Sequence, residues 1–371
     1  MKLFAASTLI FIISCTILPG NTNGSLRTPS SSSTDVNLDT TTILEHGHLR
    51  EAFRSWAKEH EREYGGVGEE LRRFAIWVKN HQYIERHNNQ NPPRSFELGH
   101  NHFSDLTNDE YQQLHFLGQY NPGIPKRPPS SNDYDEEEQQ RRQDERRTIA
   151  DLPDRIDWVE LGAVTPVENQ ARCGACWSFS ATGAIESAKF IKDGELVELS
   201  KQMMVDCDGT EMGCDGGLIT SAFQFTYGTG GLCTEEEYPY VAKQGDCRDD
   251  SCQKVPDSEV MEYVDVRAGS ETNLMHSLAM QPVSVGIQAS QTDFQLYRKG
   301  VYDSIECGDE LDHGVLAVGY GTDEMTGKTY WKVKNSWGHR WGEGGYIRIG
   351  RESSQKNGIC GILSIPSRPI V

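Results

Sequence analysis

The cysteines constrain this chain most, because nine of its ten lie beyond residue 172. Nine is an odd number, so eight can form four disulfides while one is free, bonded to another molecule or used in chemistry. Parity alone does not identify the odd one. The nine are Cys173, Cys176, Cys207, Cys214, Cys233, Cys247, Cys252, Cys307 and Cys360.

The tenth cysteine, Cys15, lies in a segment with the pattern of a secretory signal peptide. Lys2 precedes the apolar run "LFAASTLIFIISCTIL", and "PGNTNGS" follows it. We expect residues 1–24 to be this signal peptide, with cleavage between Gly20 and Gly24. The run is too short for a membrane span, so no membrane partner is expected. Secretion places the other cysteines in an oxidising compartment, where pairing is their default fate.

Four regions follow the signal peptide. Residues 25–45 are rich in Ser and Thr and are expected to form a disordered tail. Residues 46–120 show helical periodicity interrupted by "GGVG", which predicts a small helical domain. Residues 121–151 begin Pro-rich and become densely charged, which is typical of an exposed, cleavable linker. Residues 152–371 form the larger domain.

The two halves of the larger domain differ in pattern. A helix is predicted to begin at Cys176, because Ala181, Ala184, Ile185 and Ala188 recur at helical spacing. Later come "PVSVGIQA", "GVLAVGYG", "YWKVKNSWG" and "GYIRIGRE", short Val/Ile/Tyr-rich runs separated by glycine. Such runs predict a small antiparallel sheet. The fold class is therefore α+β, with helices first and strands second.

The charge of the chain limits its partners. Asp and Glu number 55 against 36 Lys and Arg, a formal net charge of −19. Phosphate recognition needs clustered Lys and Arg, so we expect no nucleic-acid partner. No metal or other cofactor is expected, and the chain is expected to be a monomer.

Cys173 and Cys176 admit several interpretations. A thioredoxin-like centre requires a βαβ context that is absent around them. A structural zinc site needs a second closely spaced pair, and six residues separate Cys207 from Cys214. The simplest alternative is that both cysteines form ordinary structural disulfides. The last is a structural Cys173 beside a nucleophilic Cys176, because the positive end of a helix dipole lowers the pKa of a thiol there.

A nucleophilic thiol needs a base, and the larger domain has three histidines. His276 lies in a predicted amphipathic helix, and His339 lies in a glycine-rich turn. His313 precedes "GVLAVGYG", where it is held at the head of a buried strand. These residues alone favour His313 but leave open that it is an ordinary core histidine.

The segment "QARCGACWSFS" resembles the active-site segment of papain-like cysteine proteases. "LDHGVLAVGYG" and "YWKVKNSWGHRWGEGGYIRIGRE" are similar to the histidine and asparagine segments of that family, and "GCDGG" and "EYPY" also match. The resemblance extends over residues 152–371. It implies a papain-like two-lobe fold, with a helical lobe and an antiparallel β-barrel-like lobe, preceded by a small α-helical propeptide domain.

The helical region also resembles this family, in the inhibitory propeptide of cathepsin L-like members. Six residues match one propeptide pattern at steps of four or three, which keeps them on one side of a helix. The only departure is Trp77, where Phe is usual. The residues are Glu69, Arg73, Trp77, Asn80, Ile84 and Asn88, and a second motif matches at Gly99, Asn101, Phe103 and Asp105.

The resemblance assigns catalytic roles. Cys176 is the nucleophile, and His313 is the partner that forms a thiolate–imidazolium pair with it. Asn335 orients the histidine, and Trp337 covers their contact. Gln170 offers its side-chain amide to the oxyanion together with the backbone N–H of Cys176.

The resemblance also implies disulfides Cys173–Cys214, Cys207–Cys247 and Cys307–Cys360. Cys233 and Cys252 remain outside the basic papain set and are predicted to form a fourth bridge. The expected pocket for the residue two before the scissile bond (P2) is apolar, so Leu, Phe or Val is predicted there and Arg is disfavoured. The substrate-binding candidates are Gly216, Gly217, Leu218, Ile219, Gly286, Leu311, Asp312, Gly314, Trp337 and Ile365.

These assignments predict an endopeptidase made as a zymogen. The propeptide is expected to lie along the cleft in the direction opposite to substrate. Acid is expected to loosen it, and cleavage then releases a chain beginning near Leu152 or Pro153. Protein and peptide substrates are expected, in a lysosome or vacuole or outside the cell. An inactive homologue acting in binding or storage is the rival, and an exopeptidase is disfavoured because no inserted segment closes the cleft.

Overall fold

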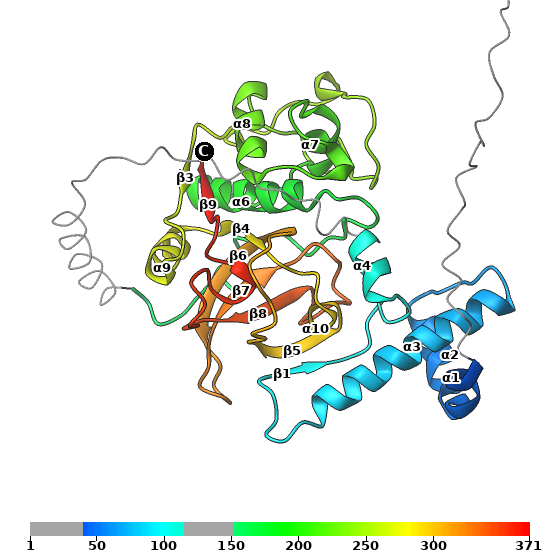
Figure 1. Cartoon of the computed structure of the whole chain (residues 1–371). Coiled ribbons are helices and arrows are strands. Elements are labelled where there is room, and N and C mark those ends of the chain that lie inside the picture. Colours follow the sequence, from blue (N-terminus) through cyan, green and yellow to red (C-terminus); the bar gives the residue numbers. More distant parts are fainter. Residues whose placement is uncertain (1–39, 115–151) are drawn as a thin grey trace, which may run out of the picture. The chain divides into compact units, whose positions relative to one another are not determined.

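The computed structural model describes residues 40–114 and 152–371 (Figure 1). The predicted signal peptide, most of the tail, residues 115–120 and the predicted linker lie outside these residues. Within the two described segments, no helix combines the length and apolar character that crossing a bilayer requires.

The first segment is mainly helical. Its core consists of Phe53, Trp56, Phe74, Trp77 and Val78, all buried, because α2 and α3 bring their aromatic faces together. The elements are α1 (Thr40–Glu45), η1 (Gly47–Leu49), α2 (Arg50–Glu59), α3 (Val67–Asn88), β1 (Phe96–Leu98) and α4 (Asn108–Leu114).

Two details differ from the sequence expectations. The expectation of a disordered tail over residues 25–45 is wrong for its last six residues, because α1 is helical and contacts α3. A distant helix supplies a partner that local composition does not reveal. The helical pattern before "GGVG" predicts a helix that continues to residue 64, but α2 ends at Glu59. Tyr64 therefore lies outside the helix and stacks on Phe53, with ring centroids 5.9 Å apart.

The second segment contains helices first and mainly strands later, which confirms the α+β class. The helices are α6 (Cys176–Asp193), α7 (Lys201–Cys207), η2 (Gly213–Asp215), α8 (Ile219–Thr229), η3 (Asp249–Ser251), α9 (Glu271–Met280), α10 (Thr292–Gln295) and η4 (Ile359–Gly361). The strands are β2 (Ile156–Asp157), β3 (Glu262–Asp265), β4 (Val283–Ile287), β5 (Tyr297–Tyr302), β6 (His313–Thr322), β7 (Thr329–Lys334), β8 (Tyr346–Gly350) and β9 (Ser367–Ile370).

The strands follow the order β1-β5-β8-β7-β6-β4-β9-β3, and β2 pairs with β6. Strand β1 comes from the first segment and pairs antiparallel with β5. The pairs are antiparallel as expected, with one exception: β5 and β8 run parallel, with Val301 opposite Arg348. Parallel strands need a long connection, and here β6 and β7 lie between β5 and β8 in the chain and supply it.

Strand β6 is shared by two hydrophobic cores. Val315 and Ala317 pack into a core with the other strands, whereas Leu316 and Val318 pack into a core with α6, α7 and α8. Successive side chains of a strand point to opposite faces, so the continuous apolar run buries both faces. Figure 1 shows α6 lying between the sheet and helices α7 and α8.

Small residues let α6 approach the sheet closely. A Cβ atom on Gly183 would lie 3.0 Å from Leu316 Cδ2, so a larger residue there would push the helix away. Ser180 Oγ donates to the Val315 carbonyl at 2.7 Å. The first residues of α6 and β6 are thereby held against one another.

Candidate active site

Cys176 is the first residue of α6 and is 4% exposed. The first residue of β6 is His313, which is fully buried. A Cβ atom on Gly314, the next residue, would lie 3.4 Å from the Cys176 carbonyl oxygen. The packing of α6 on β6 therefore brings these two predicted residues into one site. His276 lies half-buried in α9, and His339 is exposed.

Asn335 fixes the protonation of the histidine ring. Its Oδ1 atom lies 2.8 Å from His313 Nε2 and also accepts the Ser336 N–H at 2.7 Å. An oxygen acceptor requires that Nε2 carry the proton of a neutral ring. His313 Nδ1 makes no hydrogen bond to any described residue, and it is the nitrogen left to take a proton.

The indole of Trp337 stacks on His313, with ring centroids 4.7 Å apart and planes 18° apart. Trp337 is fully buried. Two aromatic residues of the first segment, Phe103 and Tyr111, each meet its ring edge-on at 5.6 Å. The first segment therefore covers the tryptophan that shields the His313–Asn335 contact.

Burial controls the ionisation of both reactive groups in this form. It raises the pKa of Cys176 to about 11, although the N–H groups of Gly314 and Trp177 act in the opposite direction. Burial also lowers the pKa of His313 to about 4, against a raising effect of Asn335. The expectation of a lowered thiol pKa from the helix dipole is wrong for this form. Burial destabilises the thiolate more than the positive end of the helix stabilises it. The pair is neutral here.

Gln170 is fully buried and held on several sides. Its Nε2 atom donates one hydrogen to the Cys173 carbonyl at 3.0 Å, and its Oε1 accepts from Ser336 Oγ. Its backbone N–H donates to the Ser336 carbonyl at 2.8 Å. An amide nitrogen carries two hydrogens, so one remains for a ligand. The sequence did not indicate Ser336 as a partner, because an Asn-Ser pair gives no signal of contact with a distant loop.

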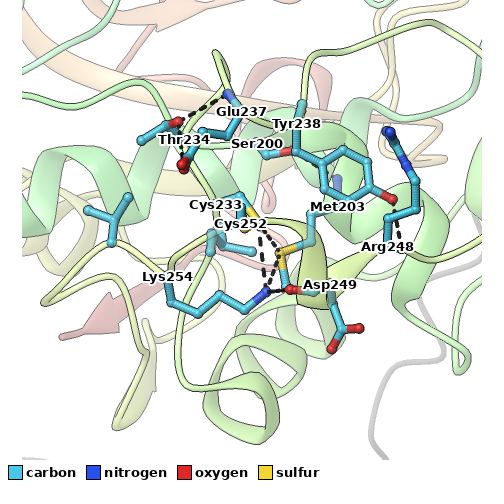
Figure 2. Close-up of a disulfide and its surroundings, with 12 residues drawn as sticks. Ser200, Met203, Cys233, Thr234, Glu237, Tyr238, Arg248, Asp249, Cys252 and Lys254 are labelled. Carbon is cyan, nitrogen blue, oxygen red and sulfur yellow. Dashed lines mark hydrogen bonds between the residues drawn. A yellow bond between two sulfur atoms is a disulfide. The ribbon is translucent and has the colours of Figure 1, made fainter.

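Eight of the nine cysteines form bonds in the structure. The bonds join Cys173 to Cys214, Cys207 to Cys247, Cys233 to Cys252 and Cys307 to Cys360. Cys176 is the free cysteine among the described residues. Figure 2 shows the Cys233–Cys252 bond with Lys254 beside it. Lys254 Nζ donates to the Asp249 carbonyl at 2.7 Å and lies 3.7 Å from Cys233 Sγ.

Five predicted substrate-binding residues lie close to one another or to the cysteine. A Cβ atom on Gly286 would lie 2.9 Å from Ile365 Cδ1 and 3.2 Å from Leu311 Cδ1. A Cβ atom on Gly314 would lie 3.5 Å from Ile219 Cδ1. These contacts gather apolar side chains around two glycines, whose lack of a side chain lets those groups approach the backbone closely.

The other predicted binding residues have different surroundings. Gly217 lies against the ring of Trp177, where a Cβ atom would lie 2.6 Å away, and Gly216 has a φ of 118° that favours glycine. Leu218 is half-buried and donates its backbone N–H to Glu211. Asp312 is buried and accepts the Ala289 N–H at 2.6 Å. Burial raises the pKa of the Asp312 carboxyl to about 6.

The first segment binds the second through its backbone as well as its aromatic rings. Strand β1 adds to the sheet beside β5, with Phe96 opposite Gly300. Asn101 Nδ2 donates to the Gln295 carbonyl at 2.8 Å, and the Tyr111 hydroxyl donates to the Ala289 carbonyl at 2.7 Å. Sequence reasoning missed β1, because "FEL" is too short to stand out from a loop.

Residues of the propeptide patterns make the internal contacts of this segment. Arg73 donates to Glu69 at 2.7 Å and to Glu110 at 2.8 Å. Asn80 donates to two carbonyls of the following loop, at 2.9 and 3.0 Å. Asn88 exchanges two hydrogen bonds with Leu98. One side of α3 thus holds the chain that leads to the sheet.

Comparisons with known proteins agree with this geometry. Residues 152–370 match the papain family of cysteine proteases, and residues 53–111 match the cathepsin propeptide inhibitor domain. The senescence-specific cysteine protease SAG12 of Arabidopsis thaliana is 39% identical over 336 residues, or 90% of this chain and 92% of that protein. The senescence-specific cysteine protease SAG39 of Oryza sativa subsp. japonica is 41% identical over 318 residues, or 85% of this chain and 88% of that protein.

Solved proforms have the same fold. The recombinant stem bromelain precursor is 38% identical with a TM-score of 0.76, covering 87% of this chain and 99% of that one. The proform of Amb a 11, a ragweed pollen allergen, is 34% identical with a TM-score of 0.76, covering 89% and 97%. Disulfide-bonded proteases of this kind are secretory-pathway proteins, often vacuolar in plants. The chain therefore belongs to the papain family of cysteine proteases and is a peptidase made as a proenzyme, whose propeptide inhibitor domain acts on its own catalytic domain.

Proposed function

We propose that the mature protein is an endopeptidase that cleaves proteins through Cys176 and His313, with a hydrophobic preference at P2. The hydrogen bond from His313 Nε2 to Asn335 Oδ1 carries this proposal. It keeps the proton on the far nitrogen and leaves Nδ1 for the thiol. The close contact between the first residues of α6 and β6 supports the same pairing of Cys176 with His313.

The reaction proceeds by acyl transfer. The thiol proton passes to His313 Nδ1, and the sulfur attacks the peptide carbonyl carbon. The carbonyl oxygen becomes an oxyanion that receives hydrogen bonds from Gln170 Nε2 and the Cys176 N–H. The C–N bond breaks as the imidazolium protonates the leaving amine. Water then attacks the thioester, with His313 as base, and releases the acid and the free thiol.

The P2 preference follows from Leu311, Ile365, Ile219 and the two glycines beside them. None of these side chains carries a charge that would pair with an arginine, so burying Arg there would leave its charge without a partner. In a fluorogenic peptide series differing only at P2, Leu, Phe or Val is expected to exceed Arg in kcat/KM. A higher value for Arg than for Leu would refute the preference.

We also propose the processing scheme. Residues 1–24 are removed as the signal peptide, residues 46–120 act as the inhibitor, and cleavage within 121–151 gives a chain beginning near Leu152 or Pro153. The mature enzyme is expected in a lysosome or vacuole, or outside the cell. A proenzyme with full activity before cleavage would contradict this scheme.

The nucleophile is tested by Cys176→Ala. Loss of a nucleophile in an acyl-transfer enzyme lowers kcat by a factor on the order of a million, so hydrolysis should vanish. A peptidyl fluoromethyl ketone should label the native mature enzyme and not the variant. An inactive binding or storage protein would fail to label in either form, which separates that rival from the proposal.

A further inference from the structure

The backbone of the candidate oxyanion residue is held from outside the active site. The carbonyl of Gln170 accepts a hydrogen bond from the Tyr240 hydroxyl at 2.9 Å. Tyr240 lies 70 residues further along the chain, and none of the assigned roles involves it. Burial raises the pKa of Tyr240 further above its usual value, so the hydroxyl keeps its proton and remains a donor.

Tyr240 is itself fixed at two other points. Its backbone N–H donates to Glu235 Oε1 at 2.7 Å. Its ring meets Phe179 edge-on, with centroids 4.8 Å apart and planes at 83°. Phe179 lies on α6 three residues after Cys176, so one tyrosine contacts both the helix of the nucleophile and the loop that carries Gln170.

A buried lysine holds the carboxylates around this tyrosine. Lys201 is 1% exposed, and its Nζ lies 2.6 Å from Glu168, 3.3 Å from Glu186 and 3.8 Å from Glu235. Burial alone would lower its pKa, but Glu186, Glu168 and Glu235 outweigh burial and raise it. The lysine therefore remains charged. It connects Glu235, which holds Tyr240, with Glu168, which lies two residues before Gln170.

This cluster also borders Asn335, the residue that orients His313. A cavity of about 20 Å³ is bordered by Glu168, Lys201 and Lys334, and also by Asn335 and Ser336. Lys334 Nζ donates to Thr165 Oγ1 at 2.9 Å, and Thr165 donates to Glu186 at 2.6 Å. The charged groups therefore join the loop before Gln170 to the end of β7.

We propose that Tyr240 is a positioning residue for Gln170, held in place by the buried Lys201 cluster. Its hydroxyl fixes the Gln170 peptide so that the side-chain amide meets the oxyanion of the transition state. The proposal rests on the oxyanion role of Gln170 in the proposed function. A positioning group of this kind acts on the tetrahedral intermediate more than on bound substrate.

The test is Tyr240→Phe in the mature enzyme, with rates normalised by active-site titration. The variant keeps the ring and its contact with Phe179 but loses the hydrogen bond. Removing an oxyanion donor costs about a hundredfold or more in kcat, so misplacing one is expected to lower kcat about tenfold with KM changed less than about twofold. Tyr238→Phe is the matched control, since its hydroxyl binds Asp206 instead, and its kcat should stay within about twofold.

Two probes separate positioning from a general loss of structure. A peptide aldehyde forms a hemithioacetal whose oxygen takes the oxyanion position, so its affinity for Tyr240→Phe should fall about as much as kcat. Dipyridyl disulfide reacts with the thiol and forms no oxyanion, so its rate should not change. Equal losses with both probes, or a kcat within about twofold of the native value, would overturn the proposal. If Gln170→Ala also leaves kcat unchanged, the oxyanion role itself fails.

Discussion

The propeptide and the peptidase domain are stabilised in different ways. The peptidase domain has four disulfides and a buried ion cluster, whereas residues 46–120 contain no cysteine. The propeptide depends on an aromatic core, on ion pairs such as Arg73–Glu69 and on largely buried neutral histidines. We therefore expect acid to weaken the inhibitor at a pH that leaves the covalent bonds of the enzyme intact.

The largest expected effect tests whether the buried ion cluster stabilises the peptidase domain. Lys201→Met leaves three carboxylates without their cation, and such a loss typically costs about 3–5 kcal/mol in the free energy of unfolding. Lys192→Met is the control, because Lys192 pairs with Asp257 at 2.7 Å on the surface and exposed pairs contribute at most about 1 kcal/mol. Similar midpoints for both variants in urea unfolding of the mature enzyme would contradict the expectation.

Removing the Cys233–Cys252 bond tests the contribution of a single covalent link. The bond closes a loop with a sequence separation of 19 residues, for which chain entropy predicts a loss of about 3 kcal/mol. The double change Cys233→Ser with Cys252→Ser should lower the thermal midpoint of the mature enzyme. It should not change the pH at which the propeptide is released, and a shift of that pH would show that the two regions are not independent.

A third prediction concerns acid release of the propeptide. Burial lowers the pKa of His100 to about 3, and the ring lies 3.0 Å from His81 and stacks on Trp77 at 4.2 Å. Above pH 6.5, the ordinary pKa of a histidine, the ring is neutral in both the folded and the unfolded protein. Below that pH the unfolded protein binds the proton first. Stability is therefore full above 6.5 and falls as the pH drops toward 3, by about 2 kcal/mol at about pH 5.

The change His100→Phe keeps the stacking and removes the proton site. In a full-length Cys176→Ala proenzyme, hydrogen exchange of α3 should accelerate less between neutral pH and about pH 5 than in the native propeptide. Glu69 makes a useful contrast: hydrogen bonds from Arg72 and Arg73 help to lower its pKa to about 2, so its contribution is lost only as the pH falls from 4.5 to 2. An unchanged pH profile in His100→Phe would assign acid release to other groups.

The smallest expected effect concerns one surface contact between the two regions. Arg340 donates to the Glu59 carbonyl at 2.9 Å and lies 3.6 Å from Glu61, in an exposed setting worth at most about 1 kcal/mol. Arg340→Ala should speed hydrogen exchange at the end of α2 by at most about fivefold. Arg54→Ala is the control, since the 3.6 Å Arg54–Glu70 pair lies within the propeptide and should not change contact with the enzyme.

The sequence predicted the elements that have strong local signals. The helix from Cys176 and the strand from His313 follow from periodicity and from a continuous apolar run. The ion cluster around Lys201 was not predicted, because its members are far apart in sequence and a lysine in "LSKQMM" reads as a surface residue. The raised pKa of Cys176 in the proenzyme was not predicted, because burial depends on the whole fold and not on one helix end.

The neutral thiol of the proenzyme also bears on how the four bridges are preserved. Thiol–disulfide exchange requires a thiolate, and burial raises the pKa of Cys176, so the thiol is mainly protonated at neutral pH. Cys176 is thus a poor nucleophile toward the four disulfides while the precursor passes through an oxidising compartment. We therefore expect the zymogen form to protect its own cross-links from scrambling as well as other proteins from hydrolysis.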